Sequence, residues 1–240
     1  MELQPRRRMS VLAIIPAAGM GLRMGSGTPK QFLSLDGVPI FVHTLRKFSH
    51  SDAIDVIYLG VRPEEMERVR QALASEHLAK PVQLVSGGVT RHETVAKALE
   101  AAPPATELVL VHDAVRPFVD LEMINRVADA ARRDGAAILG IPSVDTVKQV
   151  ERHTIVGTLP RERIVLAQTP QGFCYSILRD AFARAGSEGF LGTDESSLVE
   201  RLGINVTVLM GSDRNIKITK PSDLALARLY LAQEAESAKA

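Results

Sequence analysis

Two cationic side chains, Arg23 and Lys30, lie in a stretch rich in glycine that directly follows an apolar run. The stretch reads PAAGMGLRMGSGTPKQF over residues 16–32. Glycines allow backbone N–H groups to approach a ligand closely, and the two cations can neutralise negative charge. The pattern therefore favours a loop that wraps a polyphosphate. A plain strand-to-helix turn with solvent-facing cations is the alternative.

The glycine spacing excludes two better known phosphate-binding loops. Glycines at positions 19, 21, 25 and 27 give GxGxxxG, whereas a dinucleotide-binding fold uses GxGxxG. A Walker A loop ends in GKS or GKT, which this stretch lacks. The six histidines are scattered, and none is paired with a nucleophile at a telling spacing. The chemistry indicated is charge stabilisation, in which cations hold anionic groups together.

The loop needs a rigid frame, and alternating apolar runs and helical patterns predict one. Residues 10–19, 55–61, 82–88, 107–114 and 136–142 are typical of strands, and helical spacing separates them. This alternation predicts an α/β fold, with a mostly parallel twisted sheet and helices on both faces.

The alternation ends after Pro142. Residues 143–173 alternate Val and Thr without a strong helical pattern, which predicts a projecting β-arm that leaves the main sheet, over about residues 143–165. No linker or repeat divides the chain, so we expect one domain over 1–240, with a flexible leader at 1–9. A separate arm subdomain is the alternative.

Composition narrows the classes of partner. The chain has 240 residues and a net charge of +1, so any basic site must be local, and no nucleic-acid or membrane surface is indicated. Aromatic residues make up 4% of the chain, too few to favour a base-stacking platform. The lone cysteine, Cys174, excludes an internal disulfide and favours a cytoplasmic location.

Eight short motifs occur in order, from PAAGMGLRM near the start to NIKIT near the end, with PKQF, GGVTRHETV, VHDAVRPF, DTVK, TPQGF and TDESS between them. In this order the chain resembles the 2-C-methyl-D-erythritol 4-phosphate cytidylyltransferases of non-mevalonate isoprenoid biosynthesis, over about residues 11–230. The resemblance implies a nucleotidyltransferase fold and a homodimer joined by the arm. It also implies CTP as donor, a sugar-alcohol phosphate as acceptor, and Mg²⁺ bound mainly through the triphosphate.

The same resemblance assigns catalytic and nucleotide-binding residues. Arg23, Lys30 and Lys217 match the catalytic cations of the family. Gly88 and Thr94 would recognise the cytosine, although a Thr in the first turns of a helix often only bonds its own backbone. Backbone groups of three residues would line the nucleotide: Ala17, Ala18 and Gly19.

Asp113 ends a predicted strand at the sheet edge where open α/β folds bind ligands. It could hold a Mg²⁺–phosphate unit or a ribose hydroxyl. Arg116 could face the sugar phosphate or pair with Asp113 as a structural ion pair. We expect His112 to pack rather than to act as a ligand.

The acceptor residues are implied by the resemblance. Thr146 and Arg161, on the arm, would bind the sugar phosphate of the neighbouring subunit, and a guanidinium suits a phosphate because it donates two parallel hydrogen bonds. A solvated turn is the alternative for Arg161. Thr169 and Thr193 are further candidates, and Thr193 is equally a candidate N-cap of the following helix.

Two other functions share these features. A ribitol-phosphate or other pentitol-phosphate cytidylyltransferase shares most of the motifs, but PAAG and TDESS favour the isoprenoid enzyme. A non-catalytic nucleotide-binding protein would have lost catalytic cations, and Arg23, Lys30 and Lys217 are all present.

Overall fold

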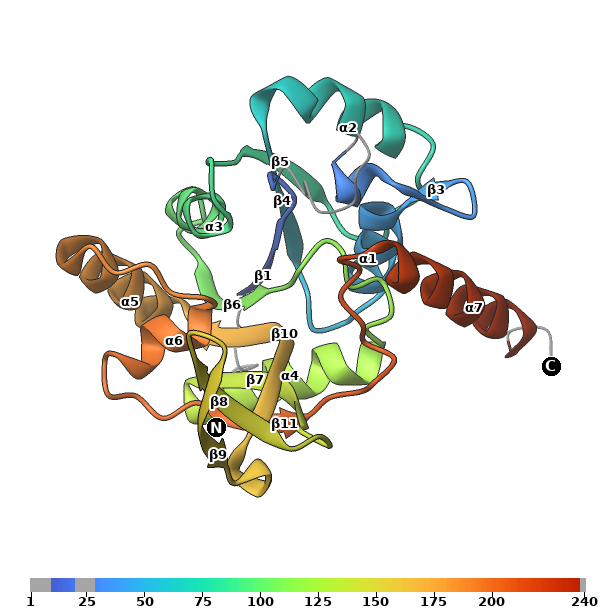
Figure 1. Ribbon diagram of the computed structural model, residues 1–240. Coiled ribbons are helices and arrows are strands. Elements are labelled where there is room, and N and C mark those ends of the chain that lie inside the picture. Colours follow the sequence, from blue (N-terminus) through green and yellow to red (C-terminus); the bar gives the residue numbers. More distant parts are fainter. Residues whose placement is uncertain (1–9, 20–28, 238–240) are drawn as a thin grey trace, which may run out of the picture.

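The computed structural model describes residues 10–19 and 29–237, so the expected leader at 1–9 and Arg23 lie outside it. Within this part of the chain, seven strands form the central sheet of Figure 1, in the order β11-β7-β10-β6-β1-β4-β5. Their bounds are β1 Ser10–Pro16, β4 Val56–Val61, β5 Val82–Ser86, β6 Thr106–Val111, β7 Ala136–Pro142, β10 Val165–Cys174 and β11 Thr207–Met210.

Six of these strands run in one direction, and β10 runs antiparallel between β6 and β7. The parallel majority confirms the predicted α/β fold. The strand β10 was not predicted, because residues 143–173 were expected to contain an arm that leaves the main sheet, over about residues 143–165. The ladder to β7 shifts register between Gln168 and Gln171, so Pro170, which has no N–H to donate, lies at the irregularity.

Helices cover both faces of the sheet because its strands bury side chains on both sides. In β1, Ala13 and Ile15 pack in the cluster of α1, α2 and α4, whereas Leu12 and Ile14 pack in that of α3, α5 and α6. No described helix is long and apolar enough to cross a membrane. The helices are α1 Ile40–Ser49, α2 Met66–Leu73, α3 Arg91–Glu100, α4 Leu121–Asp134, α5 Tyr175–Glu188, α6 Glu195–Glu200 and α7 Pro221–Ser237.

A third, smaller core fixes the segment that carries Lys217. Ile218, the next residue, is buried with Leu35, Phe118 and Ala227 of α7, and its N–H donates to the Val115 carbonyl at 2.9 Å. This packing ties the segment to the loop after β6. A short hairpin belongs to the same core, formed by β2 Ser34–Leu35 and β3 Val38–Pro39.

A two-stranded arm leaves the main sheet, as predicted, and is labelled β8 and β9 in Figure 1. β8 spans Val147–Glu151 and β9 spans Thr154–Leu159. Arg152 and His153 form the turn between them, both with positive φ. A short 3-10 turn, η4, Arg161–Arg163, leads from the arm into β10. The arm and its base expose large apolar side chains: Val144, Val150, Ile155, Val156 and Leu159.

Candidate active site

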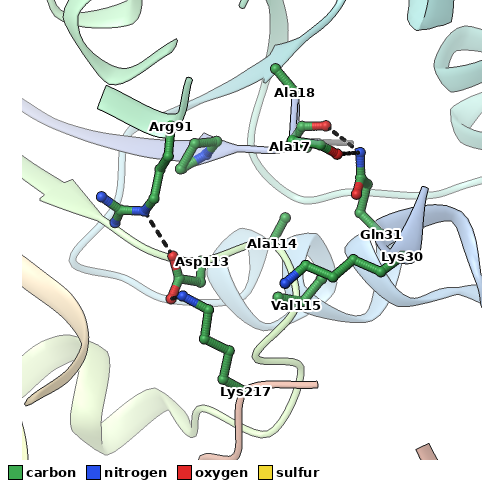
Figure 2. Close-up of a pocket in the computed structure, with 11 residues that line it drawn as sticks. Ala17, Ala18, Lys30, Gln31, Arg91, Asp113, Ala114, Val115 and Lys217 are labelled. Atoms are coloured by element: carbon green, nitrogen blue, oxygen red, sulfur yellow. Dashed lines mark hydrogen bonds and ion pairs between the residues drawn. The ribbon is translucent and has the colours of Figure 1, made fainter. Parts of the chain in front are cut away.

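The site lies at the carboxyl ends of β1 and β6, the edge at which open α/β sheets bind ligands. A cavity of about 130 Å³ opens there. In Figure 2, Lys30, Arg91 and Lys217 reach it from three separate segments, with Arg91 and Lys217 meeting at Asp113. The lining comprises Pro16, Ala17, Ala18, Gly19, Lys30, Gln31, Arg91, Asp113, Ala114, Val115 and Lys217.

A second cavity, of about 210 Å³, shares Arg91, Asp113 and Lys217 with the first. The predicted nucleotide residues at 17–19 line the first cavity only. Three predicted acceptor residues line the second cavity only: Arg116, Thr169 and Thr193. The shared side chains therefore stand between two compartments, one lined by three of the predicted nucleotide residues and the other by three of the predicted acceptor residues.

Asp113 is the electrostatic centre of the site. Its carboxylate is 2.9 Å from Lys217 Nζ, 3.0 Å from Arg91 Nε and 3.4 Å from Arg116 Nε. Burial alone would raise the pKa of the Asp113 carboxyl, but Arg91 and Lys217 outweigh burial and hold that pKa well below its usual range. Asp113 is therefore a permanent anion that gathers cations at the sheet edge.

Arg116 is held as a structural ion pair, the second of its two predicted roles. Besides contacting Asp113, its Nη1 donates to the Asn215 carbonyl at 2.7 Å. Because the Arg116 side chain is only 11% exposed, its guanidinium has limited access to the second cavity. A direct contact of Arg116 with a sugar phosphate stays a prediction.

Arg91 was not selected from the sequence, although the structure places it in both cavities. Its Nη1 and Nη2 donate to the two Glu195 oxygens at 2.6 and 2.9 Å. Burial would lower the pKa of Arg91, but the carboxylates of Glu195 and Asp113 outweigh it and raise that pKa. The sequence did contain a signal for this pair, because Arg91 lies in the motif GGVTRHETV and Glu195 lies in TDESS. Both motifs had been selected only for other residues.

Gln31, from the PKQF motif, was also missed. It lies in the 3-10 turn η2, Lys30–Phe32, and its buried amide donates to the carbonyls of Ala17 at 2.6 Å and Gly19 at 3.0 Å. These bonds hold the start of the glycine-rich stretch beside the turn that carries Lys30. Arg23 lies outside the described residues, so its predicted catalytic role stays a prediction.

Thr94 supports the turn formed by Gly87 and Gly88. Its fully buried hydroxyl donates to the Thr90 carbonyl at 2.8 Å and accepts from the Gly88 N–H at 3.1 Å. This is the backbone-bonding role that was the alternative for Thr94. Neither Thr94 nor Gly88 lines either cavity, so their contact with a base stays a prediction. A Cβ at Gly87 would overlap Ala18, which places the turn directly against the end of β1.

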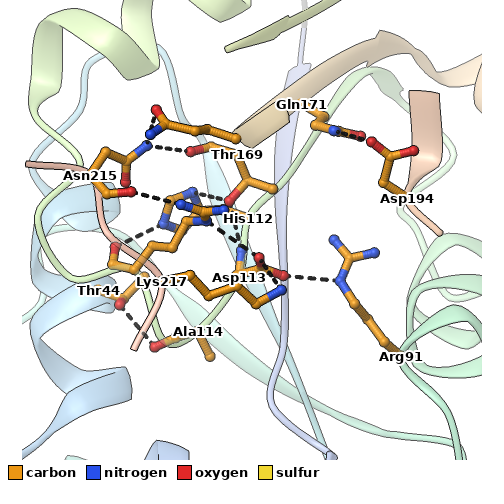
Figure 3. A network of polar contacts seen from close by, with 12 residues as sticks. Thr44, Arg91, His112, Asp113, Ala114, Thr169, Gln171, Asp194, Asn215 and Lys217 are labelled. Carbon is orange, nitrogen blue, oxygen red and sulfur yellow. Dashed lines mark hydrogen bonds and ion pairs between the residues drawn. The ribbon is translucent and has the colours of Figure 1, made fainter. Parts of the chain in front are cut away.

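His112 packs in the core, as expected, and orders the polar network of Figure 3. Its Nε2 lies 3.0 Å from the Arg116 carbonyl, which only accepts, so Nε2 carries the proton. The Thr169 hydroxyl, 3.0 Å from Nδ1, must then donate to it, while accepting from the Asp113 N–H at 3.1 Å. Thr169 is thus a buried support for Asp113, and its predicted contact with the acceptor stays a prediction.

The start of α6 corrects one assignment. Asp194, not Thr193, is the N-cap, because its carboxylate accepts from the Ser197 N–H at 3.0 Å. Gln171 of β10 donates to the same carboxylate at 2.8 Å and anchors the helix start to the sheet. Thr193 is left exposed on the second cavity, which agrees with its predicted acceptor role without testing it.

Thr146 and Arg161 are exposed at the base of the arm and line neither cavity. Arg161 Nη1 donates to the Val144 carbonyl at 2.8 Å. The structure therefore does not bring these two residues to the site of their own chain, and their role toward a neighbouring subunit stays a prediction.

The described residues contain no cluster of three or more His, Cys, Asp or Glu suited to a metal ion. Asp113, the candidate metal ligand, already faces Arg91, Arg116 and Lys217, which would repel a divalent cation beside it. This donor set does not fit a metal held by protein side chains alone.

Fold and site together define an α/β protein with a group of cationic side chains at the carboxyl edge of its sheet. Residues 11–233 match the family model described as 2-C-methyl-D-erythritol 4-phosphate cytidylyltransferase. The chain therefore belongs to this family, whose members are nucleotidyltransferases.

Individual relatives agree over nearly the whole chain. The 2-C-methyl-D-erythritol 4-phosphate cytidylyltransferase of Solibacter usitatus is 52% identical, covering 95% of this chain and 98% of its own. That of Acidobacterium capsulatum is 50% identical, covering 94% and 98%. The crystal structure of the 4-diphosphocytidyl-2C-methyl-D-erythritol synthase of Anaerococcus prevotii matches with a TM-score of 0.83 and 31% identity, over 94% and 100% of the two chains.

Proposed function

We propose that this protein transfers the cytidylyl group of CTP to 2-C-methyl-D-erythritol 4-phosphate. The products are 4-diphosphocytidyl-2-C-methyl-D-erythritol and pyrophosphate. The observation that carries this function is the group of cations at the boundary of the two cavities, in a chain of this family. In the reaction, an oxygen of the acceptor phosphate attacks the α-phosphorus of CTP, and the bond to the β-phosphate breaks.

The site has the groups that this reaction needs. The attacking phosphate is already ionised, so the main difficulty is to bring several anions together and to stabilise the added charge of the transition state. Lys30 reaches the first cavity from η2, and Lys217 reaches the boundary from the segment before α7. We assign both ammonium groups to the phosphates, with CTP in the first cavity and the acceptor in the second.

We further propose that Mg²⁺ enters with CTP, held mainly by triphosphate oxygens, because the described side chains do not form a metal cage. When bound, the ion would neutralise phosphate charge. We also propose a homodimer joined by the arm, and the exposed apolar side chains of the arm support it. We propose a cytoplasmic location as well, because a chain with a single cysteine cannot form an internal disulfide.

The test is pyrophosphate release with CTP or UTP, paired with methylerythritol phosphate or ribitol 5-phosphate. We expect turnover with CTP and methylerythritol phosphate, loss of turnover with EDTA, and recovery on adding Mg²⁺. Faster turnover of ribitol 5-phosphate, or no pyrophosphate release with any pair, would overturn the assignment. Undiminished turnover in EDTA would overturn the role of the metal alone.

A further inference from the structure

Arg91 and Lys217 hold the same carboxylate in different ways. Arg91 Nε is 3.0 Å from Asp113 Oδ1, while its two Nη atoms are fixed by Glu195, which is only 2% exposed. Lys217 Nζ is 2.9 Å from Asp113 Oδ2, and its side chain is 39% exposed. A bidentate pair fixes a planar guanidinium, whereas an ammonium on a flexible stem reorients freely. Besides Arg116, Asp113 thus has one fixed partner, Arg91, and one movable partner, Lys217.

The movable partner stands where the phosphates must meet. Lys217 lines both cavities, so a phosphate in either one competes with Asp113 for its ammonium. Once Lys217 turns to a phosphate, the buried Asp113 carboxylate loses its nearest cation, and an unpaired buried charge is strongly unfavourable. Arg91 and Arg116 then remain beside the carboxylate. Arg91 is the nearer of the two, at 3.0 Å against 3.4 Å, and Arg116 also donates to the Asn215 carbonyl.

We infer that Arg91, oriented by Glu195, is a positioning residue that keeps Asp113 neutralised while Lys217 moves from that carboxylate to a substrate phosphate. This inference rests on the proposed function. Arg91 acts through Asp113, and Glu195 acts through Arg91. Without the pair of Arg91 and Glu195, Lys217 stays bound to Asp113, and its ammonium group stabilises the substrate phosphates less.

The first experiment replaces the orienting group, Glu195→Gln, which keeps the shape and removes the charge. The matched control is Glu76→Gln, because Glu76 also receives two hydrogen bonds from one arginine, Arg46, at 2.8 Å each, but lines neither cavity. We expect kcat to fall ~10-fold or more in Glu195→Gln, with the KM for CTP changed less than ~3-fold, and kcat changed less than ~2-fold in the control.

If the pair of Arg91 and Glu195 had only a structural role, the Glu195→Gln substitution would have a different effect. It would lower the fraction of folded, CTP-binding protein, and the folded remainder would turn over at the native rate. Calorimetric titration with CTP therefore accompanies the kinetics. Full binding stoichiometry with reduced kcat supports the inference, whereas stoichiometry and rate falling together would overturn it.

The second experiment is a double-mutant cycle of Arg91→Gln and Asp113→Asn. Since Arg91 acts through Asp113, we expect Arg91→Gln to cost ~10-fold in kcat in the native background and less than ~2-fold in the Asp113→Asn background. Independent, multiplying effects would show that Arg91 acts on a substrate directly. If Arg91→Gln does not fold, Glu195→Gln decides alone.

Pyrophosphate release by the native protein is measured in parallel under the same conditions. Absence of native turnover would reject the proposed function and, with it, this inference. Native turnover together with a native kcat in Glu195→Gln would reject only the inference.

Discussion

Asp113 shows how a single buried carboxylate arranges a cationic site. Arg91 comes from α3, Arg116 from the loop after β6, and Lys217 from the segment before α7, and each contacts the same side chain. Like charges at such short range repel, so cations from three segments converge only where an anion lies between them. The carboxylate thus gathers the cations that the proposed function assigns to the substrate phosphates.

Loss of one ammonium should therefore reduce turnover more than stability. In Lys217→Met or Lys30→Met the stem is kept and the charge is removed, so we expect kcat to fall by ~10²-fold or more with the fold intact. Pyrophosphate release and circular dichroism measure the two effects. Lys47→Met, which breaks the surface pair of Lys47 with Glu234, is the control and should turn over normally. Near-normal turnover of either site variant would contradict the catalytic assignment.

His112 should make the protein less stable in mild acid. Burial lowers the pKa of His112 from 6.5 to about 4, so between these values the unfolded chain binds a proton that the native protein does not. The free energy of unfolding should fall as the pH drops through this window, by up to ~1.4 kcal/mol per pH unit from this group.

Urea unfolding of the native protein and of His112→Gln, at several pH values from 6.5 to 4.5, measures this slope. We expect a shallower slope in the variant. Burial also lowers the pKa of His43, which is present in both proteins and adds the same contribution to each. Equal slopes would show that His112 does not titrate as described.

At the scale of elements, the turn between β5 and α3 lies against the end of β1, where the first cavity opens. Contact is so close that a methyl group at Gly87 has no space beside Ala18. The turn and the strand end beside the first cavity are therefore coupled by close packing.

A methyl group at this turn should weaken CTP binding. We expect Gly87→Ala to raise the KM for CTP several-fold and to lower the free energy of unfolding by ~1–3 kcal/mol through overpacking. Gly186→Ala is the matched control, because no heavy atom lies within 4 Å of a Cβ there and alanine favours the α5 helix. An unchanged KM in Gly87→Ala would show that the turn does not border the nucleotide.

The sequence predicted most elements because the strands bury both faces and therefore appear as apolar runs. It missed β10 because Pro170 within a run argues against a central strand, and a register shift is not visible in one sequence. It missed the sheet-edge pair of Arg91 and Glu195 because these residues lie far apart in the chain. The arm was found by Val and Thr alternation, although its turn of Arg152 and His153 lacks the glycine that usually marks one.

At the scale of the whole molecule, the arm carries apolar surface that the described chain leaves uncovered. Val144 is 80% exposed and Ile155 is 59% exposed. Apolar side chains gathered on one projection are typical of an interaction surface, in agreement with the proposed dimer. Thr146 and Arg161 lie at the base of the same projection.

If Arg161 serves the neighbouring subunit, two inactive variants should complement each other. Co-expressed Arg161→Ala and Lys30→Met chains should regain activity in mixed dimers, where one of two sites is intact, giving about a quarter of native activity. Lys30→Met with Lys217→Met is the control without recovery, because both lysines serve the site of their own chain. No gain over the separate Arg161→Ala and Lys30→Met proteins would argue against shared sites.

The antiparallel insertion of β10 sets the order in which the site can form during synthesis. β6 pairs with β10, yet the ribosome makes α4, β7 and the whole arm between them. Until residues near Cys174 emerge, β6 has an open edge in the middle of the future sheet, a state that invites aggregation. Thr169, Gln171 and Glu195 are made after β6, and Lys217 is made after all three. A nascent chain therefore completes neither cavity until Lys217 has been made.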